Sequence, residues 1–126
     1  MRRTRILIAD DHALLREGLA ELISLQPDLE VVGQASDGES TLSQLRACAP
    51  DVITLDLSMP GSHGFRLIET VAREFPRTRI VVLTMHDDSA YKRAALAAGA
   101  ACYVVKSRAD EDLVKAMRDE PRDASL

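Results

Sequence analysis

The sequence predicts an α/β domain built on a doubly wound parallel sheet with five strands and five helices. Short apolar runs rich in valine, isoleucine and leucine recur five times, and a segment with helical spacing of apolar residues follows each run. Regular alternation of strand and helix requires parallel strands, right-handed crossovers and helices on both faces of the sheet. The 126 residues accommodate one compact domain of this kind.

The predicted strands are short apolar segments bounded by charges or turn residues. The first ends on two acids, the second contains Val31-Val32, the third ends before Asp56, the fourth ends on Thr84 and the fifth before Lys106. Continuous apolar runs are expected where helices cover both faces of a parallel sheet. In chain order, the strands are expected at residues 5–9, 29–35, 52–55, 80–83 and 102–105.

The predicted helices fill the intervals after the strands. The first has leucine and isoleucine along one stripe, and the fourth is rich in alanine and ends at Gly99, a typical residue after a helix C-terminus. Residues 36–38 provide turn and cap chemistry before the second helix, and residues 107–110 do the same before the last. The helices are expected at residues 13–25, 39–47, 64–75, 90–98 and 111–118.

Four of the five predicted strands lead into residues with chemical functions. Asp10 and Asp11 follow the first strand, Asp56 follows the third, Thr84 ends the fourth and Lys106 follows the fifth. Open α/β sheets bind ligands outside the carboxyl ends of their strands, and the flavodoxin-like order 2-1-3-4-5 makes the first and third strands neighbours. Singly, each residue could be a helix cap, a loop hydroxyl or a solvated charge. Their position at one edge favours a common site.

Three clustered carboxylates require positive charge nearby, because two like charges about 4 Å apart repel by about 4 kcal/mol at the effective dielectric of a protein surface. Such ligands suit Mg²⁺, which binds one or two carboxylates together with phosphate oxygens. A carboxylate beside a metal, a lysine and a hydroxyl suits phosphoryl transfer. We predict Asp56 as the nucleophile, Asp10 and Asp11 as Mg²⁺ ligands, and Lys106 and Thr84 as groups that bind the phosphoryl oxygens.

From the first strand to the last helix, the chain resembles the receiver domain of response regulators, the CheY-like family. The resemblance implies that Asp11 and Asp56 bind Mg²⁺ directly, that the backbone carbonyl of Ser58 completes the metal shell, and that Asp10 acts mainly through water. Tyr103 corresponds to the switch aromatic of the family. The segments that carry the resemblance are Ile8–His12, Asp56–Gly61, Leu83–His86 and Gly99–Lys106.

The resemblance implies a phosphorylation switch of a two-component system. A sensor histidine kinase would present phosphohistidine, and Asp56 would take the phosphoryl group with the help of Mg²⁺. The chain would catalyse only its own phosphorylation and dephosphorylation, so we do not expect a turnover enzyme. Thr84 would then move inward and Tyr103 would turn, which changes the face formed by the fourth helix, the fifth strand and the fifth helix. The expected output is a changed partner contact or homodimer contact.

The sequences of the same segments are similar to those of the NarL/FixJ-type subgroup, whose members usually continue into a helix-turn-helix domain. We expect the receiver domain at residues 1–118 and the start of a C-terminal linker or tail at residues 119–126, with no output domain in this chain. Two interpretations stay open, a free-standing receiver and the input half of a transcription factor. Ser107 follows Lys106 where many receivers have a proline in a cis bond, and a cis bond before serine is costly, so a trans bond is expected.

Composition restricts the partners. The net charge of −4 argues against direct binding of nucleic acid, which needs clustered Lys and Arg, so DNA contact would require an output domain. The apolar run at residues 6–9 is too short for a signal-peptide core or a membrane span, so we expect no membrane contact and a cytoplasmic location.

Cysteine and histidine spacing gives no sign of a metal site. Cys48 and Cys102 lie in apolar contexts without CxxC or Cys/His spacing and are expected as buried thiols. His12, His63 and His86 are expected on the surface or in loops, although His12 and His86 could border the predicted site.

Two rival functions come from other classes of protein. An aspartate-nucleophile phosphatase of the haloacid-dehalogenase kind usually has a second aspartate two residues after the nucleophile, and Ser58 stands there. A flavodoxin-like FMN-binding module is compatible with the fold, but its phosphate loop should be rich in Ser, Thr and Gly. The loop after the first strand here is acidic and would repel a phosphate that lacks a metal.

Overall fold

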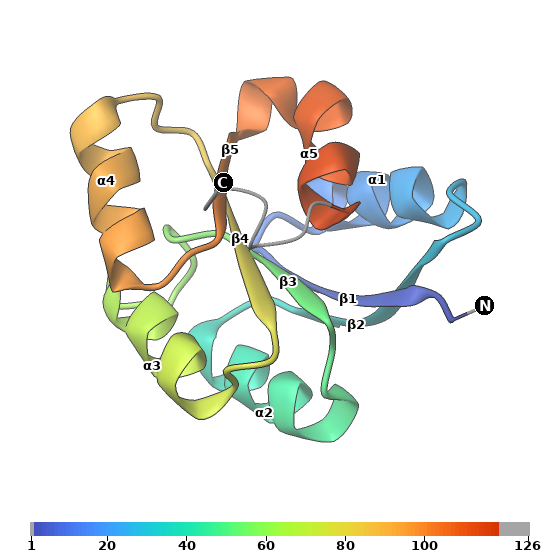
Figure 1. The fold of residues 1–126 in the computed structure, drawn as a ribbon, viewed down its shortest axis with the longest axis horizontal. Helices are drawn as coiled ribbons and strands as arrows, with labels where there is room; N and C mark the ends of the chain where they lie inside the picture. The colour runs from blue at the N-terminus through green and yellow to red at the C-terminus, as the bar shows by residue number, and fades with distance from the viewer. Residues whose placement is uncertain (1, 119–126) are drawn as a thin grey trace.

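The structure is a computed structural model that describes residues 2–118 (Figure 1). The predicted linker at residues 119–126 lies outside the described residues. Within the described range, the elements in chain order are β1 (Thr4–Ala9), α1 (Ala13–Ser24), β2 (Leu29–Ala35), α2 (Gly38–Cys48), β3 (Val52–Leu55), α3 (Arg66–Glu74), β4 (Arg79–Thr84), α4 (Ser89–Ala98), β5 (Cys102–Val105), a 3₁₀ turn η1 (Lys106–Arg108) and α5 (Ala109–Arg118).

The five strands form one parallel sheet in the order β2-β1-β3-β4-β5, which confirms the predicted fold class and strand order. Helices α1 and α5 cover one face of the sheet, and α2, α3 and α4 cover the other (Figure 1). In this order β1 and β3 are neighbours, so the residues that follow them must lie side by side at the carboxyl edge.

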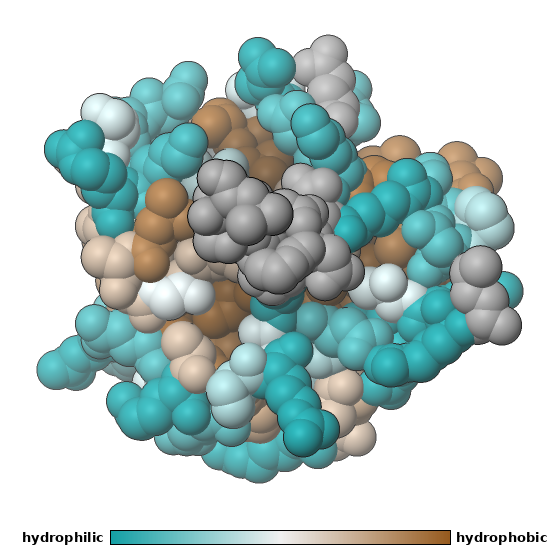
Figure 2. Space-filling model, in the orientation of Figure 1, coloured by the Kyte–Doolittle hydropathy of each residue, from teal (hydrophilic) through white to brown (hydrophobic). Residues whose placement is uncertain are grey.

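The core has two layers, one on each face of the sheet. Side chains alternate along each strand, so Ile6 and Ile8 pack under α1 and α5 while Leu7 and Ala9 pack under the other three helices. This alternation explains the continuous apolar runs, since both faces need apolar side chains. Polar residues cover much of the outer surface in the view of Figure 2, with apolar residues visible between the elements.

Element boundaries follow the prediction except at two helix starts. The third helix begins at Arg66, because His63 and Gly64 have positive φ angles of 52° and 64° that a right-handed helix does not accept. The fifth begins at Ala109, because the Ala109 N–H donates to the Lys106 carbonyl and the 3₁₀ turn runs directly into the helix. Residues 107–110, which were predicted to provide caps, therefore lie in the 3₁₀ turn and in the first turn of α5.

The cap predicted before the second helix is confirmed. The Asp37 carboxylate accepts a hydrogen bond of 2.7 Å from the Ser40 N–H, and the Ser40 hydroxyl accepts from the Asp37 N–H, which forms a capping box. Hydrogen bonds from the Ser40 N–H and hydroxyl hold the pKa of Asp37 below its ordinary value.

Two smaller predictions are also decided by the structure. The peptide bond after Lys106 is trans, as expected. The prediction that Cys48 and Cys102 are buried is wrong, because Cys48 lies at the end of α2 and Cys102 begins the edge strand β5, where each residue is half-buried. Between residues 2 and 118, no helix has the length and apolar composition needed to cross a membrane.

Candidate functional site

The backbone ladder of the sheet continues into the acidic residues after β1 and β3. The Asp10 N–H donates to the Ala35 carbonyl and the Asp56 N–H donates to the Ala9 carbonyl, each over 3.0 Å. Both aspartates are 1% exposed, so two carboxylates are buried at the carboxyl edge of adjacent strands. Backbone hydrogen bonds therefore fix the positions of both aspartates independently of their side-chain contacts.

The two oxygens of the Asp56 carboxylate have different surroundings. Oδ1 accepts hydrogen bonds from the Ser58 N–H at 3.1 Å and from the Ser58 hydroxyl at 2.8 Å. Oδ2 is buried and has no hydrogen-bond partner among the described residues, although the ammonium of Lys106 lies 3.4 Å away. The carboxylate is thus held on one side and left with binding capacity on the other.

Burial and hydrogen bonding act on the pKa of Asp56 in opposite directions. Burial raises it, but the Ser58 hydrogen bonds and the charge of Lys106 together outweigh burial and hold the pKa below its ordinary value. Asp56 is therefore a carboxylate at neutral pH, the form that can act as a nucleophile.

Lys106 reaches the acidic residues from the end of β5, across β4. Its Nζ lies 3.0 Å from Asp10 Oδ2 and 3.4 Å from Asp56 Oδ2, and its side chain is only 10% exposed. The ammonium therefore offsets both buried carboxylates. Sequence reasoning placed Lys106 at this edge, and the structure brings it into contact with them.

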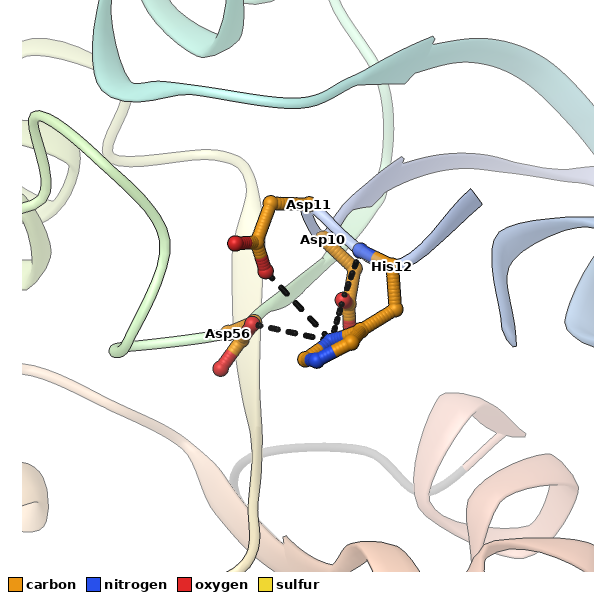
Figure 3. Close-up of side chains that lie close together, drawn as sticks. All are labelled: Asp10, Asp11, His12 and Asp56. Atoms are coloured by element: carbon orange, nitrogen blue, oxygen red, sulfur yellow. Dashed lines mark hydrogen bonds and ion pairs between the residues drawn. The ribbon is translucent and has the colours of Figure 1, made fainter. Parts of the chain in front are cut away.

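His12 borders the acidic cluster, a position that the sequence analysis left open. Its Nδ1 is 2.9 Å from Asp10 Oδ1, 3.4 Å from Asp11 Oδ1 and 4.0 Å from Asp56 Oδ2, and Figure 3 marks these contacts by dashed lines. The expectation of a surface or loop position is confirmed, since His12 precedes α1 and its side chain is 56% exposed. Its place directly after the acidic pair is the signal that could have found it.

Thr84 and Tyr103 are connected through the backbone of His86. The Thr84 hydroxyl accepts a hydrogen bond of 3.2 Å from the His86 N–H, and the Tyr103 hydroxyl donates over 2.6 Å to the His86 carbonyl. Burial, followed by the charge of Asp88, raises the pKa of Tyr103, so its hydroxyl keeps its proton. The ring of Tyr91 packs against His86 at 4.5 Å and Tyr103 at 6.4 Å between centroids.

The loop that carries Ser58 is held against the start of α2. The Gly38 N–H donates to the Pro60 carbonyl over 2.8 Å, and the buried Ser62 hydroxyl donates to the Leu57 carbonyl over 2.6 Å. A Cβ on Gly38 would lie 2.1 Å from the Gly61 carbonyl oxygen, so the two backbones approach as closely as glycine allows. Sequence reasoning did not predict this contact.

The donor atoms of the cluster fit a divalent cation. One carboxylate oxygen each from Asp10, Asp11 and Asp56, with the His12 ring nitrogen, lie within 4.8 Å of one another. Asp10 Oδ2 and Asp56 Oδ2 are buried without hydrogen-bond partners among the described residues, and the ammonium of Lys106 lies 3.0 and 3.4 Å from them. An acidic cluster of this composition is typical of a Mg²⁺ site. The contacts of Ser58 involve its N–H and hydroxyl, so the metal-binding role of its carbonyl stays a prediction.

Residues 6–118 match the family model described as the response regulator receiver domain. Among curated proteins, the oxygen regulatory protein NreC of Staphylococcus epidermidis is 42% identical over 115 residues, and NreC of Staphylococcus carnosus is 41% identical over the same length. The match covers 90% of this chain and 53% of each relative, so the chain spans about half the length of the curated relatives it matches.

Solved structures of response regulators share the fold. The receiver domain of the putative response regulator NarL from Mycobacterium tuberculosis has a TM-score of 0.84 and 37% identity, covering 92% of this chain and 94% of that one. A LuxR-family response regulator from Aurantimonas sp. SI85-9A1 has a TM-score of 0.83 and 35% identity, covering 90% and 81%. RcsB from Salmonella typhimurium has a TM-score of 0.86 and 33% identity, covering 91% and 58%.

Proposed function

Because the chain belongs to the response regulator receiver domain family, within the group of NarL- and LuxR-type regulators of two-component systems, we propose that Asp56 is its phosphoacceptor. One observation carries the proposal. Asp56 is a buried carboxylate with one oxygen held by Ser58 and one oxygen without a hydrogen-bond partner among the described residues, and it faces the ammonium of Lys106. A buried carboxylate with unused binding capacity is costly to a fold that does not use it.

The phosphoryl group comes from the phosphohistidine of a sensor histidine kinase. An oxygen of the Asp56 carboxylate attacks the phosphorus, the bond between phosphorus and the kinase histidine breaks, and an acyl phosphate forms on Asp56. Ser58 holds the carboxylate in place during the attack, and Lys106 offsets the charge of the transferred group. Asp10, Asp11, Asp56 and the Ser58 carbonyl would hold Mg²⁺, which neutralises the charge on the phosphoryl oxygens when bound.

The hydrogen bonds of His86 supply the path from Asp56 to the surface. When the Thr84 hydroxyl turns toward a phosphoryl oxygen, it leaves the His86 N–H, and the loop between β4 and α4 loses that hydrogen bond. The same loop holds the Tyr103 hydroxyl through the His86 carbonyl, so Tyr103 is freed to turn. Couplings of this type amount to about 1–3 kcal/mol, which is enough to shift a balance between two states.

The surface that changes is the face formed by α4, β5 and α5. It contains a groove of about 350 Å³ whose lining includes Lys92, Leu96, Asp112 and Lys115. A lining that combines residues of both charge signs with apolar residues suits a symmetric contact with a second copy. We expect phosphorylation to promote a homodimer, measured as a concentration-dependent shift in sedimentation velocity when a phosphodonor is added.

In the full-length protein we propose that the switch controls a DNA-binding output domain. The chain covers about half of NreC, and the related RcsB of Salmonella enterica has been solved bound to a promoter in the presence of the phosphomimetic BeF₃⁻. A free-standing receiver that acts only through protein contacts is the alternative. The reading frame downstream of Leu126 decides between them.

The phosphoacceptor is tested by intact mass spectrometry after incubation with acetyl phosphate and Mg²⁺. The wild type is expected to gain the mass of one phosphoryl group, and Asp56→Asn is expected to gain none. Asp51→Asn is the matched control, since Asp51 lies at the opposite end of the same strand. An adduct that persists in Asp56→Asn, or no adduct in the wild type, overturns the proposal.

A further inference from the structure

We propose that His12 turns the acidic cluster into a mixed nitrogen and oxygen site that binds a divalent transition-metal ion of the Zn²⁺ type more tightly than Mg²⁺. The inference rests on the proposed function, because it adds a ligand to the same cluster. The inference concerns which metal ion binds to the cluster, whereas the proposed function concerns the phosphorylation of Asp56.

The spacing of the donor atoms supports ligation by His12 (Figure 3). Neighbouring ligands at about 2.1 Å from an ion are about 3.0 Å apart in an octahedral site and about 3.4 Å apart in a tetrahedral site. His12 Nδ1 lies 2.9 Å from Asp10 Oδ1 and 3.4 Å from Asp11 Oδ1. Both separations match those of ligands that share one ion, although without an ion the 2.9 Å contact is a hydrogen bond between Nδ1 and Asp10 Oδ1, and Lys106 Nζ lies 3.4 Å from Nδ1.

Two buried oxygens give independent support for a cation at this position. Asp10 Oδ2 and Asp56 Oδ2 belong to residues that are 1% exposed, and neither has a hydrogen-bond partner in the part of the chain that the structure describes. Lys106 lies 3.0 and 3.4 Å from them and supplies one positive charge against three carboxylates. A divalent ion supplies the remaining two, so the cluster as a whole becomes neutral.

His12 can bind a metal without leaving Asp10 unsatisfied. The His12 backbone N–H already donates to Asp10 Oδ1 over 2.8 Å, so this oxygen keeps a hydrogen bond when Nδ1 presents its lone pair to an ion. The ring is 56% exposed, which gives it room to adjust. Ligation requires the neutral tautomer with its proton on Nε2, and that nitrogen can face water.

A nitrogen ligand changes the order of metal preference. Mg²⁺ favours oxygen ligands and retained waters, whereas imidazole suits Zn²⁺, Ni²⁺ and Cu²⁺, whose affinities for mixed sites exceed those of earlier divalent ions. One imidazole therefore raises the affinity for Zn²⁺ with little effect on Mg²⁺. Zn²⁺ would then compete with Mg²⁺ for the carboxylate that accepts the phosphoryl group.

The test is isothermal titration of the purified chain with Zn²⁺ and, separately, with Mg²⁺ at one fixed pH. His12→Gln is expected to weaken Zn²⁺ binding by at least about tenfold, the lower end of what losing a partner of a metal ligand costs, and to change Mg²⁺ binding much less. His63→Gln is the matched control, because His63 lies on the exposed loop after Asp56 and outside the cluster. Asp56→Asn should also weaken Zn²⁺ binding, which places the ion in this cluster rather than at the thiols.

Two results overturn the inference. One is equal Zn²⁺ affinity in the wild type and His12→Gln, provided that circular dichroism shows both to be folded. The other is an equal loss of Zn²⁺ and Mg²⁺ affinity in His12→Gln, which would assign His12 a general positioning role. His12→Asn repeats the test with a shorter amide if His12→Gln fails to fold. Failure of the proposed function is distinct, since it shows as a missing phosphoryl adduct on the wild type with Mg²⁺.

Discussion

Strand β3 has a carboxylate at each end, and the two have opposite surroundings. Asp51, before the strand, accepts hydrogen bonds on both oxygens, from the Arg2 guanidinium at 2.6 Å and from the Arg5 N–H at 2.9 Å. Asp56, after the strand, has one oxygen bound by Ser58 and one without a hydrogen bond. A satisfied carboxylate stabilises the fold, whereas an unsatisfied one keeps binding capacity for a ligand.

The same contrast extends to the two edges of the sheet. At the amino edge, the Arg5 guanidinium donates to the carbonyls of Cys48 and Ala49 at the end of α2, and Arg79 donates to the Ala116 carbonyl in α5. At the carboxyl edge, carboxylates crowd together around one lysine. Hydrogen-bonded ion pairs dominate the amino edge and crowded carboxylates dominate the carboxyl edge, although the buried Arg79 Nε at the amino edge also has no hydrogen-bond partner among the described residues. We expect substitutions at the two edges to differ in size and in their dependence on Mg²⁺.

The largest effect is expected from Gly38→Ala, which tests whether close packing holds the loop of the carboxyl edge. The new Cβ would meet the Gly61 carbonyl oxygen, which is a backbone atom and cannot turn away as a flexible side chain could. Overpacking of this kind should lower the free energy of unfolding by about 3 kcal/mol, measured by urea denaturation.

Gly18→Ala is the control for Gly38→Ala, because Gly18 lies inside α1 and nothing lies within 4 Å of its added Cβ. Helix propensity predicts that this variant is more stable by up to about 1 kcal/mol. If Gly38→Ala is as stable as the wild type, the contact with Gly61 does not hold the loop.

The next largest effect is stabilisation by Mg²⁺, which should depend only on residues at the carboxyl edge of the sheet. At a Mg²⁺ concentration ten times the dissociation constant, the wild type should gain about 1.4 kcal/mol of unfolding free energy, seen as a higher Tm. Asp51→Asn should show the same gain, and Asp56→Asn should lose most of it. An equal rise in Tm for Asp56→Asn would mean that the ion binds elsewhere.

Asparagine at either end of β3 should lower stability in metal-free buffer, for different reasons. Asp56→Asn removes a charge whose pKa the Ser58 hydrogen bonds and Lys106 hold below its ordinary value, so folding favours the ionised form and the variant should lose less than about 1 kcal/mol. Asp51→Asn weakens hydrogen bonds with Arg2 and Arg5 and should lose about 1 kcal/mol. Urea denaturation of both variants measures the losses, and a gain in Asp56→Asn would show that repulsion within the cluster outweighs Ser58 and Lys106.

The smallest effect concerns pH at the amino edge. A hydrogen bond from Arg118 holds the pKa of Asp28 below its ordinary value. A lowered pKa in the folded state gives stability that is fully present above the unfolded pKa of about 3.9 and is lost as the pH falls through the folded value. The difference in unfolding free energy between wild type and Asp28→Asn should therefore shrink in acid. A difference that stays constant from neutral pH to below pH 3 would exclude this ion pair as a source of stability.

Much of the fold could be predicted from local patterns. The strand at residues 52–55 has the predicted bounds because three apolar residues and a β-branched threonine between two acids fit a strand buried on both faces. The starts of α3 and α5 could not be predicted, since they depend on positive φ angles at His63 and Gly64 and on a 3₁₀ turn after Lys106. Such conformations are decided by how the loops meet the rest of the fold.

The sequence by itself determined which residues reach the carboxyl edge, because strand periodicity and the right-handed connections of parallel strands assign Asp10, Asp56 and Lys106 to that edge. Only the tertiary structure decided how their side chains are used: that Ser58 holds one oxygen of Asp56, that His12 points into the cluster, and that His86 joins Thr84 to Tyr103. The physical reason is the separation along the chain of the residues that each property depends on. Periodicity is a property of neighbouring residues, whereas the satisfaction of a buried polar atom depends on distances of a few tenths of an ångström between distant segments.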